Sequence, residues 1–180
     1  MKLMTFPLIL LAMMLTLGCS TSPKSEEGKA NLHDDINATM NRFKREDPGL
    51  DAFLNHAYGY AMFPSVGKGA VGVGGAYGRG EVYEQGKLIG YSDLSQATVG
   101  LQLGGQEYAE LIVFENQTAL DRFTHGNFAF SANASAVALK AGAAAATTFR
   151  DGVAVFTQAK GGLMFEASIG GQKFGYQAIR

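Results

Sequence analysis

The chain of 180 residues has a single cysteine, no tryptophan and only four prolines. With no second cysteine, no internal disulfide can form, so stability must come from burial of apolar surface. The three histidines, His33, His56 and His125, do not have the spacing of metal ligands, and no further cysteine could complete a zinc site. We therefore expect no metal and no other cofactor, and we interpret the histidines as surface or helix-capping residues.

The chain also lacks an excess of charge of either sign. Its 15 basic and 16 acidic residues give a formal net charge of −1, which is too balanced to indicate nucleic-acid binding. No G-x-S-x-G nucleophile elbow is present, and the adjacent Asp34 and Asp35 would point in different directions on a helix. No residue is a candidate for catalysis, and we expect a protein that is not an enzyme.

Glycine is abundant instead. Nine of the 24 residues from Gly67 to Gly90 are glycine, and they alternate with valine, alanine and tyrosine. A flexible linker would contain serine or proline, whereas β-branched and aromatic residues favour strands. We interpret this run as strand backbone without side chains on one face. Such a backbone lets a sheet curl, lets another backbone approach, or leaves a shallow surface for a flat ligand.

Two apparent nucleotide motifs fall within the same run. Residues 67–72 match G-x-G-x-x-G, but more glycine and valine follow where a dinucleotide site needs a helix. Residues 80–87 are one residue too long for a phosphate loop, and Leu88 stands where Ser or Thr would bind magnesium. Neither motif predicts a nucleotide site.

Residues 1–18 have the pattern of a signal peptide. Lys2 precedes an apolar stretch from Leu3 to Leu17, which is too short for a spanning helix. Cys19 stands where a bacterial lipoprotein leader places the residue that is acylated, although Thr16 departs from the usual pattern. We expect acylation of Cys19; cleavage nearby that leaves a free thiol, or an uncleaved leader, are the alternatives.

The residue after Cys19 is serine, which resembles the outer-membrane sorting pattern of Gram-negative lipoproteins. We therefore expect an exported, lipid-anchored protein of the outer membrane, facing the periplasm and carrying palmitate or a similar acyl chain. Residues 19–30 are small, polar and charged after the cysteine, and they predict a flexible tether. Residues 31–180 then form one domain.

Spacing predicts three helices. Apolar residues recur every three or four positions between Asn31 and Asp47, where Pro48 and Gly49 end an amphipathic helix. A shorter helix follows from Leu50 to His56, and the segment NQTALDRFTHGN predicts a third that ends at Gly126. The basic cluster Arg42, Lys44 and Arg45 allows the first helix to lie on a membrane, but we favour packing of its apolar side on the sheet.

Period-two alternation predicts strands through most of the remaining chain. The expected strands are 70–77, 80–83, 87–91, 97–103, 108–114, 153–158, 163–169 and 173–176, with an extended start at 58–63. The stretch 128–146 is ambiguous: we expect a strand in its first half and leave its alanine-rich second half open. The fold class is α+β, with a curled, mostly antiparallel, Gly-rich sheet that is barrel- or sandwich-like. Amphipathic helices precede the sheet and one helix is inserted between its strands.

Four segments in this order resemble the SYLF domain, also called the Ysc84 actin-binding domain. They are FPSVGKGAVGVGGAYGRGEVY at 63–83, ATVGLQLGGQEYAELIVFEN at 97–116, ALDRFTHGNFAFSANASAVA at 119–138 and AVFTQAKGGLMFEASIGGQKF at 154–174. The resemblance implies lipid binding, notably of phosphoinositides in eukaryotic members. Bacterial relatives resemble exported lipoproteins, which agrees with the leader. We do not carry over actin binding, because a bacterial periplasm contains no actin.

Cations beside the Gly-rich and carboxy-terminal turns are the candidates for lipid headgroups: Lys68, Arg79, Lys87, Lys160 and Lys173. Three or four of them on one face would contribute about 1 kcal/mol each at an anionic surface. If they are scattered, they are ordinary solubilising charges, which is the commoner case.

Two functions follow. The first is a membrane-anchored lipid-binding module of the bacterial envelope whose partner is membrane phospholipid. The alternative is an envelope structural or interaction lipoprotein, whose exposed strand edges pair with another protein and which has no specific lipid ligand.

Overall fold

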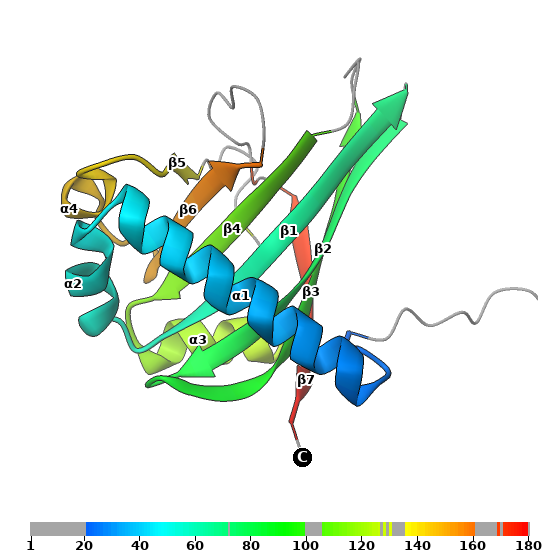
Figure 1. The fold of residues 1–180 in the computed structure, drawn as a ribbon, viewed down its shortest axis with the longest axis horizontal. Helices are drawn as coiled ribbons and strands as arrows, with labels where there is room; N and C mark the ends of the chain where they lie inside the picture. Colours follow the sequence, from blue (N-terminus) through cyan, green and yellow to red (C-terminus); the bar gives the residue numbers. More distant parts are fainter. Residues whose placement is uncertain are drawn as a thin grey trace, which may run out of the picture.

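A computed structural model describes residues 21–71, 73–99, 106–126, 128, 130, 136–160, 169 and 171–179. Seven strands in these ranges form one sheet in the order β5-β6-β4-β1-β2-β3-β7, with helices on both sides (Figure 1). Each strand pair is antiparallel except β5 with β6, so the expected α+β fold with a mostly antiparallel sheet is confirmed. The elements are α1 (Glu26–Glu46), α2 (Gly49–Asn55), β1 (Gly59–Val71), β2 (Val73–Glu84), β3 (Lys87–Val99), β4 (Gln106–Phe114), α3 (Gln117–Thr124), β5 (Val137–Ala138), α4 (Ala143–Ala146), β6 (Val153–Ala159) and β7 (Gln172–Ala178).

The three expected helices are present, and their first residues are fixed by caps. Ser25 Oγ accepts a hydrogen bond from Gly28 N at 3.0 Å, so α1 begins at Glu26 instead of Asn31. The expectation of a flexible tether up to residue 30 is therefore wrong for residues 26–30, which are helical. At α3, Asn116 Oδ1 accepts from Ala119 N at 3.0 Å in the same way.

The Gly-rich run forms the antiparallel pair β1 and β2. Val71 pairs with Val73, so the chain reverses there, and the expected single strand 70–77 is wrong. Pro64 does not end β1, because a bulge between Met62 and Ser65 accommodates a residue that cannot donate to the ladder. Gly67–Val71 lie in a strand and not in a phosphate-binding turn.

The carboxy-terminal half contains most of the expected strands. The described side chains of β4 are buried from Tyr108 to Phe114, as its apolar run predicts, and β6 and β7 extend the expected segments by a residue or two. The expected strand in the first half of 128–146 is wrong at the described positions, because Phe128 and Phe130 lie outside strands and β5 has two residues. In the expected strands 97–103 and 163–169, residues 100–103 and 163–168 lie outside the described ranges.

The sheet is strongly curled but not closed. Three strands separate β4 from β7, which in a flat sheet would place them about 19 Å apart. Nevertheless Gln172 Nε2 of β7 donates to Glu110 Oε2 of β4 at 2.9 Å across the concave side. Glycines allow this curl: a Cβ on Gly78 would lie 2.8 Å from the carbonyl oxygen of Ser65 in β1. Glycine at this position therefore lets the backbones of neighbouring strands approach closely.

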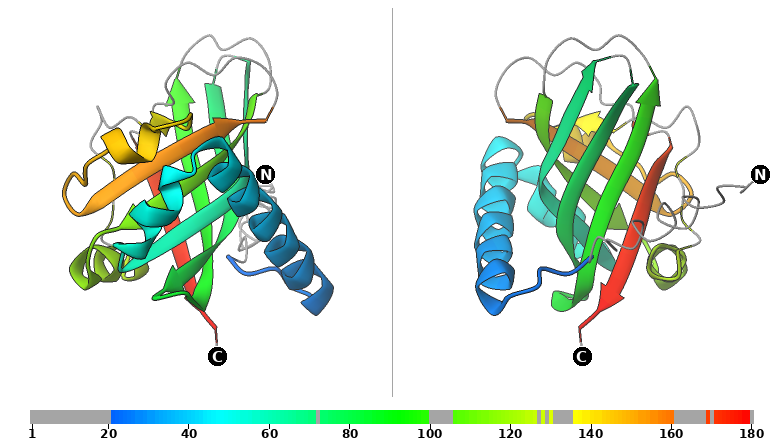
Figure 2. Two further views of the ribbon diagram at one scale, coloured as in Figure 1. Left: turned by 60° about the vertical axis from the view of Figure 1, so that its left-hand side comes forward. Right: turned by 90° about the vertical axis from the view of Figure 1, so that its right-hand side faces the viewer.

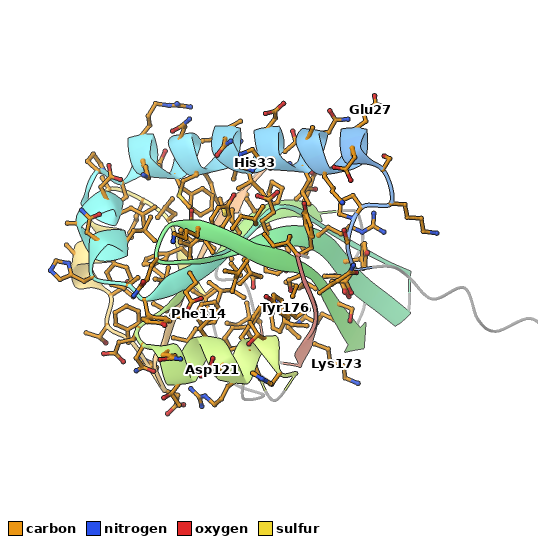
Figure 3. All side chains as sticks on the ribbon, turned by 90° about the horizontal axis from the view of Figure 1, so that it is seen from below. Glu27, His33, Phe114, Asp121, Lys173 and Tyr176 are labelled. Carbon is orange, nitrogen blue, oxygen red and sulfur yellow. The ribbon has the colours of Figure 1, made fainter. Side chains whose placement is uncertain are left out.

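The two sides of the sheet have separate cores. The concave face carries Phe63, Leu94 and Phe114, which pack with α3. The opposite side, here called the outer face, carries Met62 and Leu111, which pack with α1, α2 and α4. In the right view of Figure 2 the strands lie between α1 and α3, and Figure 3 shows Phe114 and Tyr176 between the sheet and α3.

The amphipathic side of α1 packs on the sheet, as we expected. Ile36 and Phe43 are buried there, while Arg42 Nε donates to Gln158 Oε1 of β6 at 2.7 Å and Lys44 Nζ forms an ion pair with Asp51 of α2 at 2.7 Å. Among the described residues, no helix combines the length and the apolar character needed to cross a membrane.

Candidate functional site

Helix α1 covers only part of the outer face. It crosses the sheet diagonally, and Tyr83 and Tyr91 are buried in its neighbourhood (Figure 1). Toward the β1–β2 reversal the outer face is open: the side chains of Tyr77, Ser95 and Lys173 are exposed. This uncovered part of the sheet is the candidate site.

Strand register brings two of the predicted cations together on this open part. Ser95 of β3 pairs with both Tyr77 of β2 and Lys173 of β7, and in the next row Asp93 pairs with Arg79 and Gly175. Directly paired residues of antiparallel strands share a face, so Arg79 and Lys173 lie two strands and one row apart on the same face, roughly 12 Å diagonally across the sheet. We call Tyr77, Arg79, Ser95 and Lys173 the outer patch.

Tyr77 is the aromatic member of the outer patch, and the sequence analysis missed it. Its side chain is 42% exposed, one of two large apolar residues so exposed in the described part of the chain. The Arg79 guanidinium lies 5.8 Å from the Tyr77 ring centroid, and Arg79 Nε donates to the Tyr77 hydroxyl at 3.0 Å. The two-residue spacing on an alternating strand was the signal that could have paired them.

The segment that precedes α1 lies beside the outer patch. Ser22 is buried, and Thr21 Oγ1 would lie 3.1 Å from a Cβ on Gly175 of β7. Thr21 and Ser22 are thus a packed part of the fold, and the right view of Figure 2 shows the segment before α1 crossing from that helix toward β7. Cys19, the predicted acylation site, lies outside the described residues, two positions before Thr21.

Lys160 shares the outer face but is engaged by a carboxylate. Lys160 Nζ forms an ion pair with Glu107 Oε1 at 2.9 Å, and Ser65 Oγ donates to the same oxygen. The hydrogen bond from Ser65 and then the contact with Lys160 lower the pKa of Glu107, so this carboxylate stays ionised at neutral pH. Lys160 therefore brings less free positive charge than expected.

The other two predicted cations do not join the outer patch. Lys87 begins β3 at the turn after Glu84, nine residues before Gln96 and about 30 Å from the patch end of the strand. Lys68 pairs with Ala76, whose side chain belongs to the concave core, so its register position is on the opposite face. The side chain of Lys68 lies outside what the structure describes. Of the five cations, the fold brings together Arg79 and Lys173.

Under α1, a buried carboxyl group meets a histidine. Glu81 of β2 is fully buried, accepts a hydrogen bond from the Tyr83 hydroxyl, and lies 3.0 Å from His33 Nδ1. Burial, and then the bond to Glu81, strongly raise the pKa of Tyr83. His33 therefore joins α1 to the sheet. His56 and His125 agree with the interpretation as helix-capping residues, since Nδ1 of each ring lies 2.7 Å from a backbone carbonyl oxygen of the preceding turn.

A second buried carboxyl group lies on the concave face. Glu110 of β4 is fully buried, and its Oε2 accepts from Gln172 Nε2. Gln172 Nε2 also lies 3.4 Å from the Tyr108 hydroxyl. Neither buried acid was a candidate in the sequence analysis, although Glu110 stands beside the apolar run 111–114, where a charge is unexpected.

One hollow of about 490 Å³ lies between α1, α2 and the β2–β3 turn. Met40, Leu54 and Tyr60 line its apolar part, and the ion-paired Lys44 and Asp51 stand at its polar part. No residue of the outer patch lines it, and it lies at the opposite end of the strands from Tyr77.

Two comparisons with known proteins find similar sequences. Residues 95–177 match the family model Ysc84, described as "Las17-binding protein actin regulator". The chain is also 26% identical over 159 residues to beta cell expansion factor A of Aeromonas veronii, which covers 85% of this chain and 59% of that protein. The chain thus spans less than two thirds of the length of this curated relative. The match runs through residues 95–177, from the last part of β3 to β7, and it is to the same family that the sequence resembles, also called the SYLF domain family.

Proposed function

We propose that the chain is a membrane-anchored lipid-binding module of the bacterial cell envelope, and that the outer patch meets the phospholipid headgroups. Cys19 supplies the acyl anchor, in an exported protein held at the outer membrane and facing the periplasm. The module works by binding and not by catalysis. Its match to the Ysc84 family supports lipid binding in general, and the outer patch is the feature of this chain that supports headgroup contact.

The observation that carries the proposal is the convergence of Arg79, Lys173 and Tyr77 on sheet surface that no described helix covers. Arginine and lysine complement phosphate oxygens, and tyrosine prefers the boundary between headgroups and acyl chains. Thr21 packs at Gly175 beside this surface, so an acyl group on Cys19 would bring the same face of the domain to the bilayer.

The outer patch alone is a weak lipid ligand. Two cations contribute about 2 kcal/mol in total at an anionic surface, and Asp93 opposes part of this charge. An anchor changes the situation, because it converts patch binding into an intramolecular step with a high effective concentration of lipid. The proposal therefore needs both parts: the acyl chain holds the domain, and the outer patch orients it.

The test uses the chain starting at Ser20, because every described element lies within residues 21–179. We expect it to sediment with vesicles of anionic phospholipid at low salt, and to be released as salt screens the contact. Arg79→Glu with Lys173→Glu should weaken binding at least tenfold, since about 1 kcal/mol per cation is lost and repulsion is added.

The matched control is Lys87→Glu with Lys140→Glu, which makes the same change in net charge at exposed positions away from the outer patch. A loss equal to that of the patch pair would show that only net charge matters. Absence of sedimentation at low salt would remove the lipid claim for this domain.

The alternative, an envelope interaction protein, is favoured by one feature of the sheet. β7 is an end strand that pairs with β3 alone among the described strands, so its far edge can accept a strand of another protein. Crosslinking in cells from exposed β7 positions should then capture a stoichiometric protein partner. Crosslinks to lipid alone would favour the outer patch.

A further inference from the structure

The concave interior contains a carboxyl–amide pair whose hydrogen bonding is incomplete. Glu110 and Gln172 are both fully buried, and Gln172 Nε2 donates to Glu110 Oε2 at 2.9 Å. The other oxygen of each side chain, Glu110 Oε1 and Gln172 Oε1, has no hydrogen-bond partner among the described residues. Two buried acceptors without donors are costly and need an explanation.

One proton on Glu110 removes both deficits. A protonated carboxyl has one O–H donor, and the free oxygen of the neighbouring amide is an acceptor. Together with the existing Nε2–Oε2 bond, an O–H on Oε1 that donates to Gln172 Oε1 would complete a cyclic pair with two hydrogen bonds. With Glu110 ionised, both of these oxygens stay without a donor among the described residues.

The surroundings of Glu110 favour the neutral form. On its own strand it faces the Tyr108 hydroxyl, and its register partners are Phe63 of β1 and Thr157 of β6. Among the described side chains on these elements and on β7, Tyr108 is the one titratable group facing it, and none carries a positive charge. Lys68 has a register position on the same face, with its side chain outside the described part. Burial raises the pKa of Glu110 to about 7, against a smaller opposing effect of the bond from Gln172.

The two strands that carry this pair are not equally secured. β4 lies between β1 and β6 and forms ladders with both, whereas β7 is an end strand with β3 as its one described neighbour. A charge forming on Glu110 needs water, and water can enter most easily by separation of the less secured strand. β7 is also the strand that carries Lys173 of the outer patch and Gly175, where Thr21 packs.

We propose that a proton shared between Glu110 and Gln172 acts as a latch that holds β7 against the concave interior, and that loss of this proton loosens β7 and with it the outer patch. Rising pH would therefore release the patch residue Lys173 from its fixed position across β3 from Arg79. The latch itself depends only on the buried pair; its effect on membranes rests on the proposed function.

The first experiment measures the latch without lipid, on the chain starting at Ser20. The equilibrium constant for unfolding should rise by up to about tenfold per pH unit between pH 5 and pH 7, beyond the contribution of other groups, because one proton is released on unfolding. Glu110→Gln should abolish this part of the slope, because a second amide completes the cyclic pair without ionising. Glu115→Gln, an exposed acid after the same strand, is the control and should retain it.

Two further measurements separate a latch from a merely structural role. Infrared difference spectra between pH 6 and pH 9 should show a buried protonated carboxyl that is absent from Glu110→Gln. Hydrogen exchange, corrected for its intrinsic pH dependence, should increase in β7 more than in β1 over the same range, and only in the parent chain. Equal pH slopes in the parent and in Glu110→Gln, or exchange that rises equally in both strands, would overturn the latch.

The membrane arm compares vesicle binding at pH 6 and pH 9. The parent chain should bind anionic vesicles several-fold more weakly at pH 9, and Glu110→Gln should bind equally at both. Binding that is pH-dependent to the same extent in both proteins would contradict the coupling. If neither protein binds at any pH, the proposed lipid function fails while the latch still stands or falls on the unfolding and exchange data.

Discussion

The molecule buries two glutamates on opposite faces of one sheet, and they are held in different ways. Glu81 on the outer face lies under α1, and two groups can donate to its Oε2, the Tyr83 hydroxyl and the half-exposed His33, while its Oε1, like Glu110 Oε1, has no hydrogen-bond partner among the described residues. Glu110 on the concave face has one donor, the side-chain amide of Gln172. Both are fully buried, so burial alone does not distinguish them.

The difference lies in access to a compensating group. His33 reaches Glu81 from a helix whose other side faces solvent, and its Nδ1 lies 3.0 Å from the buried Oε2. Glu110 has no such neighbour among the described residues, so its cheapest state is neutral. One face therefore uses a buried acid to hold a helix, and the other uses a buried acid that must keep its proton.

The largest expected effect is that replacing each glutamate by glutamine changes the free energy of unfolding in opposite directions. The pKa of Glu110 is about 7 in the fold against 4.5 for an ordinary glutamate, so the folded state holds a proton that the unfolded chain releases between these values. The contribution of Glu110 to the free energy of unfolding is therefore fully present below pH 4.5, and about 3 kcal/mol of it is lost as the pH rises from 4.5 through 7. At pH 8, Glu110→Gln should therefore raise the free energy of unfolding by up to about 3 kcal/mol in denaturant titrations.

At the outer face, Glu81→Gln should lower the free energy of unfolding at pH 8 by about 1–3 kcal/mol, because Tyr83 and His33 lose a carboxylate acceptor within a buried site. If both substitutions changed stability in the same direction, the two acids would not differ in the way their contacts indicate.

Removing the hydroxyl groups of Tyr83 and Tyr108 should have an intermediate effect on stability. Tyr83→Phe removes a hydroxyl that donates directly to Glu81 and should destabilise the fold by about 1–2 kcal/mol. Tyr108→Phe removes a hydroxyl whose described partner is Gln172 Nε2 at 3.4 Å, and should cost less than about 1 kcal/mol. Thermal unfolding of the two variants at one pH makes the comparison, and a larger loss for Tyr108→Phe would reverse it.

The smallest expected effect is at His33. His33→Ala should lower the free energy of unfolding by about 1 kcal/mol or less, because the ring is half-exposed and its bond to Glu81 competes with water. The amino-terminal half of α1 should exchange its amide hydrogens faster, while α3 on the other face should not change. Equal acceleration in both helices would show that His33 acts on global stability.

Local patterns predicted the helices and most of the strands. The spacing of Ile36 and Phe43, and a polar cap at Asn116, are signals that depend on a few neighbouring residues. The reversal after Val71 could not be placed, because glycine, the usual marker of a turn, occurs throughout that run. The extended segment was expected at 58–63, but a bulge lets β1 continue past Pro64.

The candidate site was only half predictable. Arg79 and Lys173 were named from their residue types, but they meet only because β3 places Asp93 and Ser95 between β2 and β7. Such pairing joins positions far apart in the chain, and no local pattern contains it. The same holds for Glu110 and Gln172, whose contact depends on the curl of three intervening strands.

The pairing of Gly90 with Ala178 also governs how the molecule forms. β1, β2 and β3 can assemble from neighbouring segments, but β3 keeps an unpaired edge until almost the entire polypeptide has been made. Contacts of such long sequence separation slow the search for the native state, because loop closure precedes any gain. A nascent chain therefore exposes the unpaired edge of β3 from the synthesis of residue 99 until that of residues 172–178, and this is the stage at which chaperones would protect it most from aggregation.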